Sequence, residues 1–129
     1  VVSREGTEEV LKYLYNKGYK IVIATNGPLI PLKEKLNKLK IDTYVNTIFS
    51  AEEVGHMKPH DLYYEGLLKK ANVKSTDKVL CIGDNLDTDV KGGIEHGFDT
   101  CWCNYNNEIN EKYNTNYEIT KLTDLIEIL

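Results

Sequence analysis

Three acidic side chains follow an apolar run in the segment "VLCIGDNLDTDVKGG", residues 79–93. Asp84 directly follows the run, and Asp87 and Asp89 come within the next five positions. Like charges at the end of a buried strand repel one another and resist desolvation, so a positive partner is expected beside them. Asp84 and Asp89, the second near the positive end of a following helix, suit a hard cation such as Mg²⁺. The segment therefore predicts a magnesium site.

A structural interpretation of this segment stays open: a turn followed by a helix that Asp87 or Thr88 caps. An EF-hand calcium loop does not fit, because apolar Leu86 falls at a ligand position. Gly92 and Gly93 would each cost a helix about 1 kcal/mol relative to alanine. Two such glycines beside the acidic residues suggest close packing there.

Two further sets of polar residues lie next to expected strands or helices. Thr25, Asn26 and Gly27 close an apolar run, and their hydroxyl, amide and relaxed backbone could donate hydrogen bonds to an oxyanion. The alternative is an ordinary Asn-Gly turn. Lys58 precedes Pro59, which favours an extended lysine just before a helix, where its ammonium could neutralise a phosphate. The alternative is a solvated surface lysine.

Apolar periodicity places these residues on a pattern of alternating strands and helices. Such a pattern predicts an α/β fold, a Rossmann-like three-layer parallel sheet in one domain, 1–129, with ligands bound at the carboxyl ends of the strands. The 19–25 and 78–83 strands are expected to be buried on both faces. In chain order the pattern predicts a helix over 7–17, a strand over 19–25, a helix carrying Leu32, Leu36 and Leu39, a strand over Thr47–Ser50, a helix over 61–72 capped by Asp61, a strand over 78–83, a helix over 87–96, a strand over 99–105, a polar loop over 104–116, a strand over 117–120 and a helix over 122–129.

Composition narrows the class of protein. The chain has 129 residues, of which 41% are hydrophobic and 28% charged, and a net charge of -4 argues against general binding to nucleic acid. Neither a membrane-spanning apolar run nor a signal segment is recognisable in the sequence. Cys81, Cys101 and Cys103 are an odd number in strand-like stretches, which is typical of reduced core residues in a cytoplasmic protein.

The order of these groups resembles the haloacid dehalogenase-like (HAD) hydrolase superfamily, and in particular its nucleotidase-like phosphatases. Thr25-Asn26 is similar to the second motif, Lys58-Pro59 to the third, and Gly83-Asp84 with Asp89 to the fourth. The closing stretches "GFDTCWCN" and "YEITKLTDLIEIL" are similar as well. One departure is His60-Asp61, where the family often has Asp-Pro.

The resemblance implies a role for each group. Residues 25–27 would hold the phosphoryl group of a small phosphorylated metabolite, for example a nucleoside monophosphate. Lys58 would neutralise this group and the nucleophile. Asp84 would ligate Mg²⁺, and Asp89 would ligate it or orient its waters. Such an arrangement of charges is what phosphoryl transfer chiefly requires.

The first motif of the family, a strand ending in Asp-x-Asp, is not found in this sequence. In the family its first Asp is the nucleophile, which forms an aspartyl phosphate, and the second is the general acid/base. The one Asp-x-Asp, at 87–89, belongs to the fourth motif. The chain begins Val-Val-Ser, and Met57 is its only methionine. The helical cap that this branch of the family usually carries between its first and second motifs is not found either. We therefore expect a carboxyl-terminal portion of a phosphatase that is inactive by itself.

In the family fold the nucleophile strand lies between the strands that here end at Thr25 and Gly83. Without it, about ten backbone groups would lie in a buried slot at about 1–3 kcal/mol each if unsatisfied. That cost rivals the stability of a whole domain, about 5–15 kcal/mol. Either the two strands pair directly, another chain or fragment supplies the central strand, or the protein is longer.

A non-catalytic module that binds phosphate and Mg²⁺, or serves in assembly, is the alternative function. A response-regulator receiver fits poorly, because its acidic pair comes first in the chain and here the pair comes last. Dinucleotide-binding and P-loop proteins are disfavoured as well, since neither glycine motif occurs.

Overall fold

The computed structural model describes residues 5–129, except for the side chain of Asp77. Its strands are all parallel, and the first four alternate with helices along the chain, which confirms the predicted α/β class. The chain divides into two compact units: the first runs up to Gly55 and includes Leu122–Leu129, and the second is His56–Lys121. In the described range, residues 5–129, no helix has the length and apolar character needed to cross a membrane.

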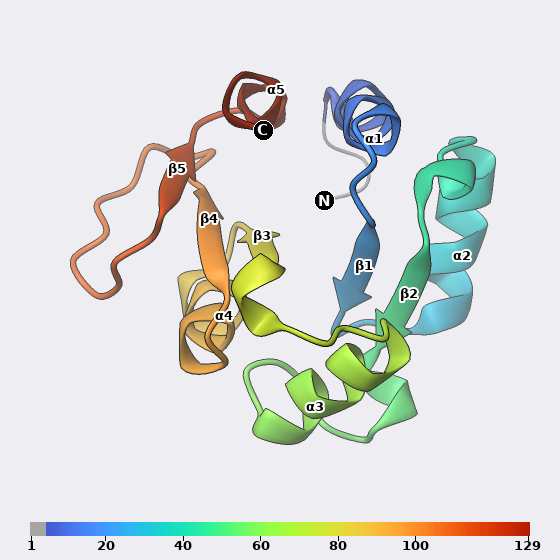
Figure 1. Cartoon of the computed structure of the whole chain (residues 1–129), viewed down its shortest axis with the longest axis horizontal. Helices are drawn as coiled ribbons and strands as arrows, with labels where there is room; N and C mark the ends of the chain where they lie inside the picture. The colour runs from blue at the N-terminus through green and yellow to red at the C-terminus, as the bar shows by residue number, and fades with distance from the viewer. Residues whose placement is uncertain (1–4) are drawn as a thin grey trace. The chain divides into compact units, whose positions relative to one another are not determined.

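The first unit contains a two-stranded parallel sheet with helices (Figure 1). Thr25 lies opposite Ser50 at the carboxyl ends of its two strands. Val10, Leu11 and Leu14 are buried on one face of the first helix, as their spacing predicts. The elements of this unit are α1 (Thr7–Asn16), β1 (Val22–Thr25), α2 (Leu29–Lys38), η1 (Asp42–Tyr44), β2 (Thr47–Ser50), η2 (Ala51–Glu53), η5 (Leu122–Asp124) and α5 (Leu125–Ile128).

The second unit contains a three-stranded parallel sheet in the order β3-β4-β5 (Figure 1). Gly83 at the end of β3 is in register with Trp102 of β4. The segment between β4 and β5 has neither helix nor strand, as predicted. The elements are α3 (Asp61–Lys70), η3 (Thr76–Lys78), β3 (Leu80–Gly83), η4 (Leu86–Val90, a π-helical turn), α4 (Lys91–Glu95), β4 (Asp99–Cys103) and β5 (Tyr117–Ile119).

The burial predicted for two strands is wrong. All four residues of β1, and Leu80–Ile82 of β3, are only half-buried. Each of these strands is an edge strand, with a paired strand on one side only, and the two belong to different sheets. Direct pairing of β1 with β3, one outcome expected from the sequence, is therefore not observed in residues 5–129.

Two helix starts also differ from the prediction. His60, not Asp61, caps α3, because its Nδ1 accepts a hydrogen bond from the Leu62 N–H at 3.0 Å. The helix predicted over 87–96 begins with η4, which Asn85 caps instead of Asp87 or Thr88. Several residue types can cap a helix, and the backbone geometry just before the helix selects one of them.

Close packing explains why α4 contains two glycines. A Cβ at Gly92 would overlap the hydroxyl and ring of Tyr64, and one at Gly93 would lie 2.8 Å from Cγ2 of Thr100. Both glycines are buried. Close packing, as suggested by the sequence, therefore offsets their low helix propensity.

Substitution of Gly92 by alanine tests this packing. Alanine favours a helix over glycine by about 1 kcal/mol, but overpacking against Tyr64 costs about 1–3 kcal/mol. We expect Gly92→Ala to lower the free energy of unfolding, measured by urea denaturation. In a Tyr64→Leu background, where the overlap is gone, the same substitution should cost nothing. Wild-type stability of Gly92→Ala would contradict this account.

Candidate functional site

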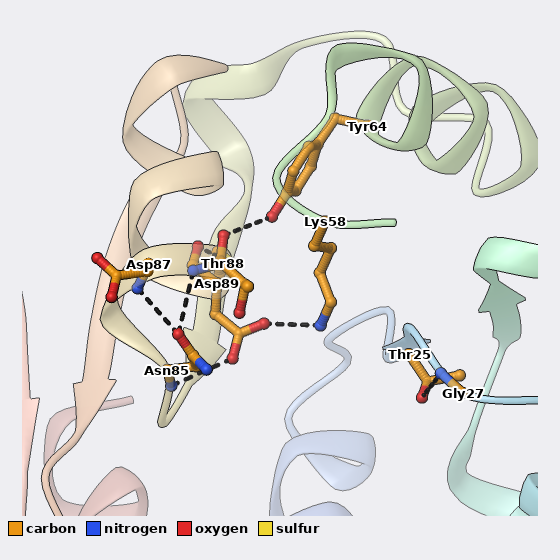
Figure 2. Close-up of polar contacts among 9 residues, drawn as sticks. Thr25, Gly27, Lys58, Tyr64, Asn85, Asp87, Thr88 and Asp89 are labelled. Atoms are coloured by element: carbon orange, nitrogen blue, oxygen red, sulfur yellow. Dashed lines mark hydrogen bonds and ion pairs between the residues drawn. The ribbon is translucent and has the colours of Figure 1, made fainter. Parts of the chain in front are cut away.

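The acidic segment of the second unit forms a tight turn after β3 (Figure 2). The Asn85 side chain accepts hydrogen bonds from the backbone N–H groups of Asp87 at 2.9 Å and Thr88 at 3.2 Å. Asp89, within η4, reaches back toward the strand end. Gly83 permits this approach, because a Cβ there would overlap the Asp89 carboxylate. The turn thus brings Asp84 and Asp89 to the carboxyl end of β3.

Lys58 supplies a positive partner for this cluster. Its Nζ lies 2.6 Å from Oδ1 of Asp89, while Oδ2 of Asp89 accepts from the Asn85 N–H at 3.4 Å. The two side chains of the ion pair are only 13% and 14% exposed. Lys58 is therefore not a solvated surface lysine. The sequence predicted a positive partner and assigned it to a metal ion, whereas the structure shows an ammonium in contact with Asp89 (Figure 2).

Three side chains hold backbone carbonyls of the acidic turn. Trp102 Nε1 donates to the Asp84 carbonyl at 3.1 Å, the Tyr64 hydroxyl to that of Thr88 at 3.0 Å, and the Cys81 thiol to that of Asp89 at 3.4 Å. Burial, together with the nearby Asp89 carboxylate, raises the pKa of Cys81 to about 12, so the thiol keeps its proton at neutral pH. No local sequence pattern marks these contacts, so they were not predicted.

The Asp84 carboxylate remains exposed and lines an open cleft of about 520 Å³. The cleft lies between the acidic turn and the loop that follows β4. Its lining residues are Asp84, Asn85, Leu86, Asp87, Glu108, Ile109, Glu111 and Lys112. A ligand in this cleft could therefore reach the carboxylate of Asp84.

In the first unit, the residues predicted to bind phosphate form a turn at the end of β1. Thr25 Oγ1 accepts from the Gly27 N–H at 3.0 Å, and Ser50 Oγ donates to the Gly27 carbonyl at 2.7 Å. Asn26 is half-buried. A threonine hydroxyl that accepts one hydrogen bond can still donate its proton to another group.

Ser50 is a residue that the sequence analysis missed. It is fully buried at the end of β2, and its backbone N–H donates to Oε2 of Glu53 at 3.0 Å. Its hydroxyl fixes the turn that follows β1. The Ser-x-x-Glu spacing of a capping box was a signal that could have singled it out.

The acidic turn offers ligands of the type that a magnesium ion prefers. No group of three or more His, Cys, Asp or Glu side chains arranged to bind a metal occurs in residues 5–129. Asp84 and Asp89 offer carboxylate oxygens, which Mg²⁺ prefers, and Mg²⁺ usually keeps several waters beside one or two carboxylates. Because Asp89 contacts Lys58, Asp84 is the better placed direct ligand.

Comparison with known proteins identifies the class. Residues 1–103 match the haloacid dehalogenase-like hydrolase family. A solved structure of the HAD-hydrolase YfnB from Bacillus subtilis, bound to magnesium, superposes with a TM-score of 0.87 and 31% identity over 98% of this chain. The parallel sheets, the acidic turn and these matches place the chain in the HAD class of α/β proteins. The chain belongs to the haloacid dehalogenase-like hydrolase family.

Curated relatives give particular activities. Pyrimidine 5'-nucleotidase PynA from Streptococcus pneumoniae is 31% identical over 96% of this chain, and glyceraldehyde 3-phosphate phosphatase from Pyrococcus furiosus is 30% identical over 96%. The chain covers 53% of each of these relatives and 54% of the YfnB chain. It therefore spans about half the length of the proteins it matches.

Removal of Lys58 tests the ion pair. Lys58→Met would leave the Asp89 carboxylate partly buried without its ammonium. We expect a loss of about 1–3 kcal/mol in the free energy of unfolding, below the 3–5 kcal/mol of a fully buried pair. The control is a double-mutant cycle with Asp89→Asn, in which the second substitution should cost less in the Lys58→Met background than in the wild type. Additive losses would show that the pair contributes nothing.

Proposed function

We propose that the complete protein is a Mg²⁺-dependent phosphatase that hydrolyses small phosphorylated metabolites, including nucleoside monophosphates. The observation that carries the proposal is the Lys58–Asp89 ion pair beside the exposed Asp84, at the end of a parallel strand in a HAD-family chain. The names of relatives support the substrate class, since they include a pyrimidine 5'-nucleotidase and a glyceraldehyde 3-phosphate phosphatase.

In this proposal each candidate residue has a distinct task. Asp84 would ligate Mg²⁺ directly, and the bound ion would supply positive charge for the phosphoryl oxygens. Asp89 holds the Lys58 ammonium in place and would orient water bound to the ion. Lys58 would neutralise the phosphoryl group and the nucleophile. Groups fixed before the reaction stabilise the transition state without reorganisation.

The proposed nucleophile is the first aspartate of an Asp-x-Asp at a strand end, as in the rest of the family. None of the strands β1 to β5 ends in such an aspartate. They end at Thr25, Ser50, Gly83, Cys103 and Ile119. The nucleophile would therefore come from polypeptide outside these 129 residues. Its carboxylate attacks phosphorus, the ester P–O bond breaks as the leaving oxygen gains a proton, and water then hydrolyses the aspartyl phosphate.

We also propose that the protein is cytoplasmic. The three cysteines, all free and lying on β3 and β4, suit a reducing compartment. A small phosphorylated substrate fits the same location.

Asp84→Asn in the complete protein tests the metal ligand. Loss of one carboxylate from the site should lower kcat for a nucleoside monophosphate by about 100-fold or more, because the metal charge is lost or displaced. Asp87→Asn is the matched control: this carboxylate belongs to the same cluster but is 65% exposed and pairs with Lys112 at 3.4 Å. Activity of the control should stay within about 3-fold of wild type. Equal effects of the two substitutions would exclude Asp84 as the specific ligand.

The 129-residue chain by itself should have no phosphatase turnover. The expected result is no release of product from a generic aryl phosphate, with the length of the chain verified by intact mass. Stabilisation of this chain against heat by Mg²⁺ and inorganic phosphate, without turnover, would favour the alternative, non-catalytic binding module. Turnover by a chain of verified mass would show that its nucleophile lies within these residues.

A further inference from the structure

We propose that Tyr64 is a positioning residue for Asp89: its hydroxyl holds the carbonyl of Thr88 and so fixes the turn from which Asp89 reaches Lys58. This role belongs to the function proposed above, and the expected effect of Tyr64 on catalysis rests on that proposed function. Tyr64 lies on α3, and Thr88 and Asp89 lie on η4, so the contact joins two elements of the second unit.

The ring of Tyr64 is fixed by its surroundings. Tyr64 is 1% exposed. Its ring stacks on His96 with centroids 4.5 Å apart and meets Phe98 edge-on at 6.0 Å and Tyr63 edge-on at 5.4 Å. A ring held on several sides has a single direction for its hydroxyl, so the hydroxyl is a rigid donor.

The hydroxyl of Tyr64 donates its hydrogen bond to η4, the π-helical turn. In η4 the Asn85 carbonyl accepts from the N–H of both Asp89, at 3.0 Å, and Val90, at 3.2 Å, and the second of these is the wide spacing of a π-helical turn. Such turns are rare and often lie at functional sites. The Thr88 carbonyl accepts from the Lys91 N–H and, from outside the helix, from Tyr64 at 3.0 Å (Figure 2).

The protonation state of Tyr64 suits this task. Burial raises the pKa of Tyr64 above its ordinary value, and the nearby Cys81 and Asp89 groups raise it further. The hydroxyl therefore remains protonated at neutral pH and donates its hydrogen. A buried hydroxyl costs free energy unless it is paired, and the Thr88 carbonyl provides the partner.

The sequence of α4 accommodates the same contact. A Cβ at Gly92 would overlap the Tyr64 hydroxyl and ring. Filling the core here requires only an aromatic ring, which phenylalanine would also supply. The hydroxyl adds a hydrogen bond to the backbone one residue before Asp89, and this is the contribution that packing alone does not explain.

The test compares Tyr64→Phe with Tyr63→Phe in the complete protein. Both variants keep the ring and remove a buried hydroxyl from adjacent positions of α3. For Tyr64→Phe we expect kcat for a nucleoside monophosphate at saturating Mg²⁺ to fall about 10-fold, as for partners that orient metal-site residues. KM should stay within about 2-fold, because Tyr64 does not touch the substrate, and Tyr63→Phe should leave both constants close to wild type.

A second measurement does not depend on activity. Backbone amide exchange over residues 85–90, measured by mass spectrometry without metal or substrate, should be about 5-fold faster in Tyr64→Phe, the loss of one hydrogen bond of about 1 kcal/mol. Tyr63→Phe should leave this segment unchanged. Such a result, together with the fall in kcat, supports the proposal.

The outcomes separate the two proposals. Unchanged kcat and unchanged exchange in Tyr64→Phe overturn the positioning role, and so does an equal effect of Tyr63→Phe, which would indicate general packing of α3. An active wild type with either of these results leaves the proposed function standing. A wild type without Mg²⁺-dependent turnover overturns the proposed function and the catalytic role of Tyr64, while the exchange data still decide whether Tyr64 holds the turn.

Discussion

The ion pair between Lys58 and Asp89 is the interaction on which the second unit's candidate site depends. It joins the segment before α3 to the turn after β3, across 31 positions of sequence. Both groups are largely buried, so screening by solvent is weaker than for a surface pair. The geometry demands a glycine at position 83, where a side chain would occupy the space of the Asp89 carboxylate.

The backbone around this pair is held more firmly than the carboxylate that faces the cleft. Carbonyls of Asp84, Thr88 and Asp89 accept hydrogen bonds from side chains on β4, α3 and β3. The Asp84 carboxylate, in contrast, is exposed. A fixed backbone that presents an accessible carboxylate is suited to binding a ligand at little reorganisation cost.

The sequence predicted the features that depend on local pattern. The strand at Thr47–Ser50, the buried face formed by Val10, Leu11 and Leu14, and the placement of Asp84 just after a strand all follow from periodicity and residue type. Family membership also followed from the order of the motifs.

The remaining features depend on tertiary contacts, which one sequence does not encode locally. The half-buried state of β1 and β3 depends on their position in the two sheets. The hydrogen bonds from the side chains of Ser50, Tyr64 and Trp102 to backbone carbonyls join residues at least 18 positions apart. Charge pairing was similarly non-local: the sequence required a positive partner for the acidic cluster, and an ammonium from a different segment supplies one.

Charge balance around the turn argues for a cation at Asp84. Of the three carboxylates, Asp89 is paired with Lys58 in a mostly buried contact, and Asp87 meets Lys112 in an exposed contact that contributes little. Within residues 5–129, no ion pair involves the Asp84 carboxylate. Neighbouring negative charges disfavour a further carboxylate unless a cation offsets them. A divalent ion at Asp84 would relieve this repulsion while leaving the Lys58–Asp89 pair intact, so the ammonium and the metal would act as complementary partners of one acidic cluster.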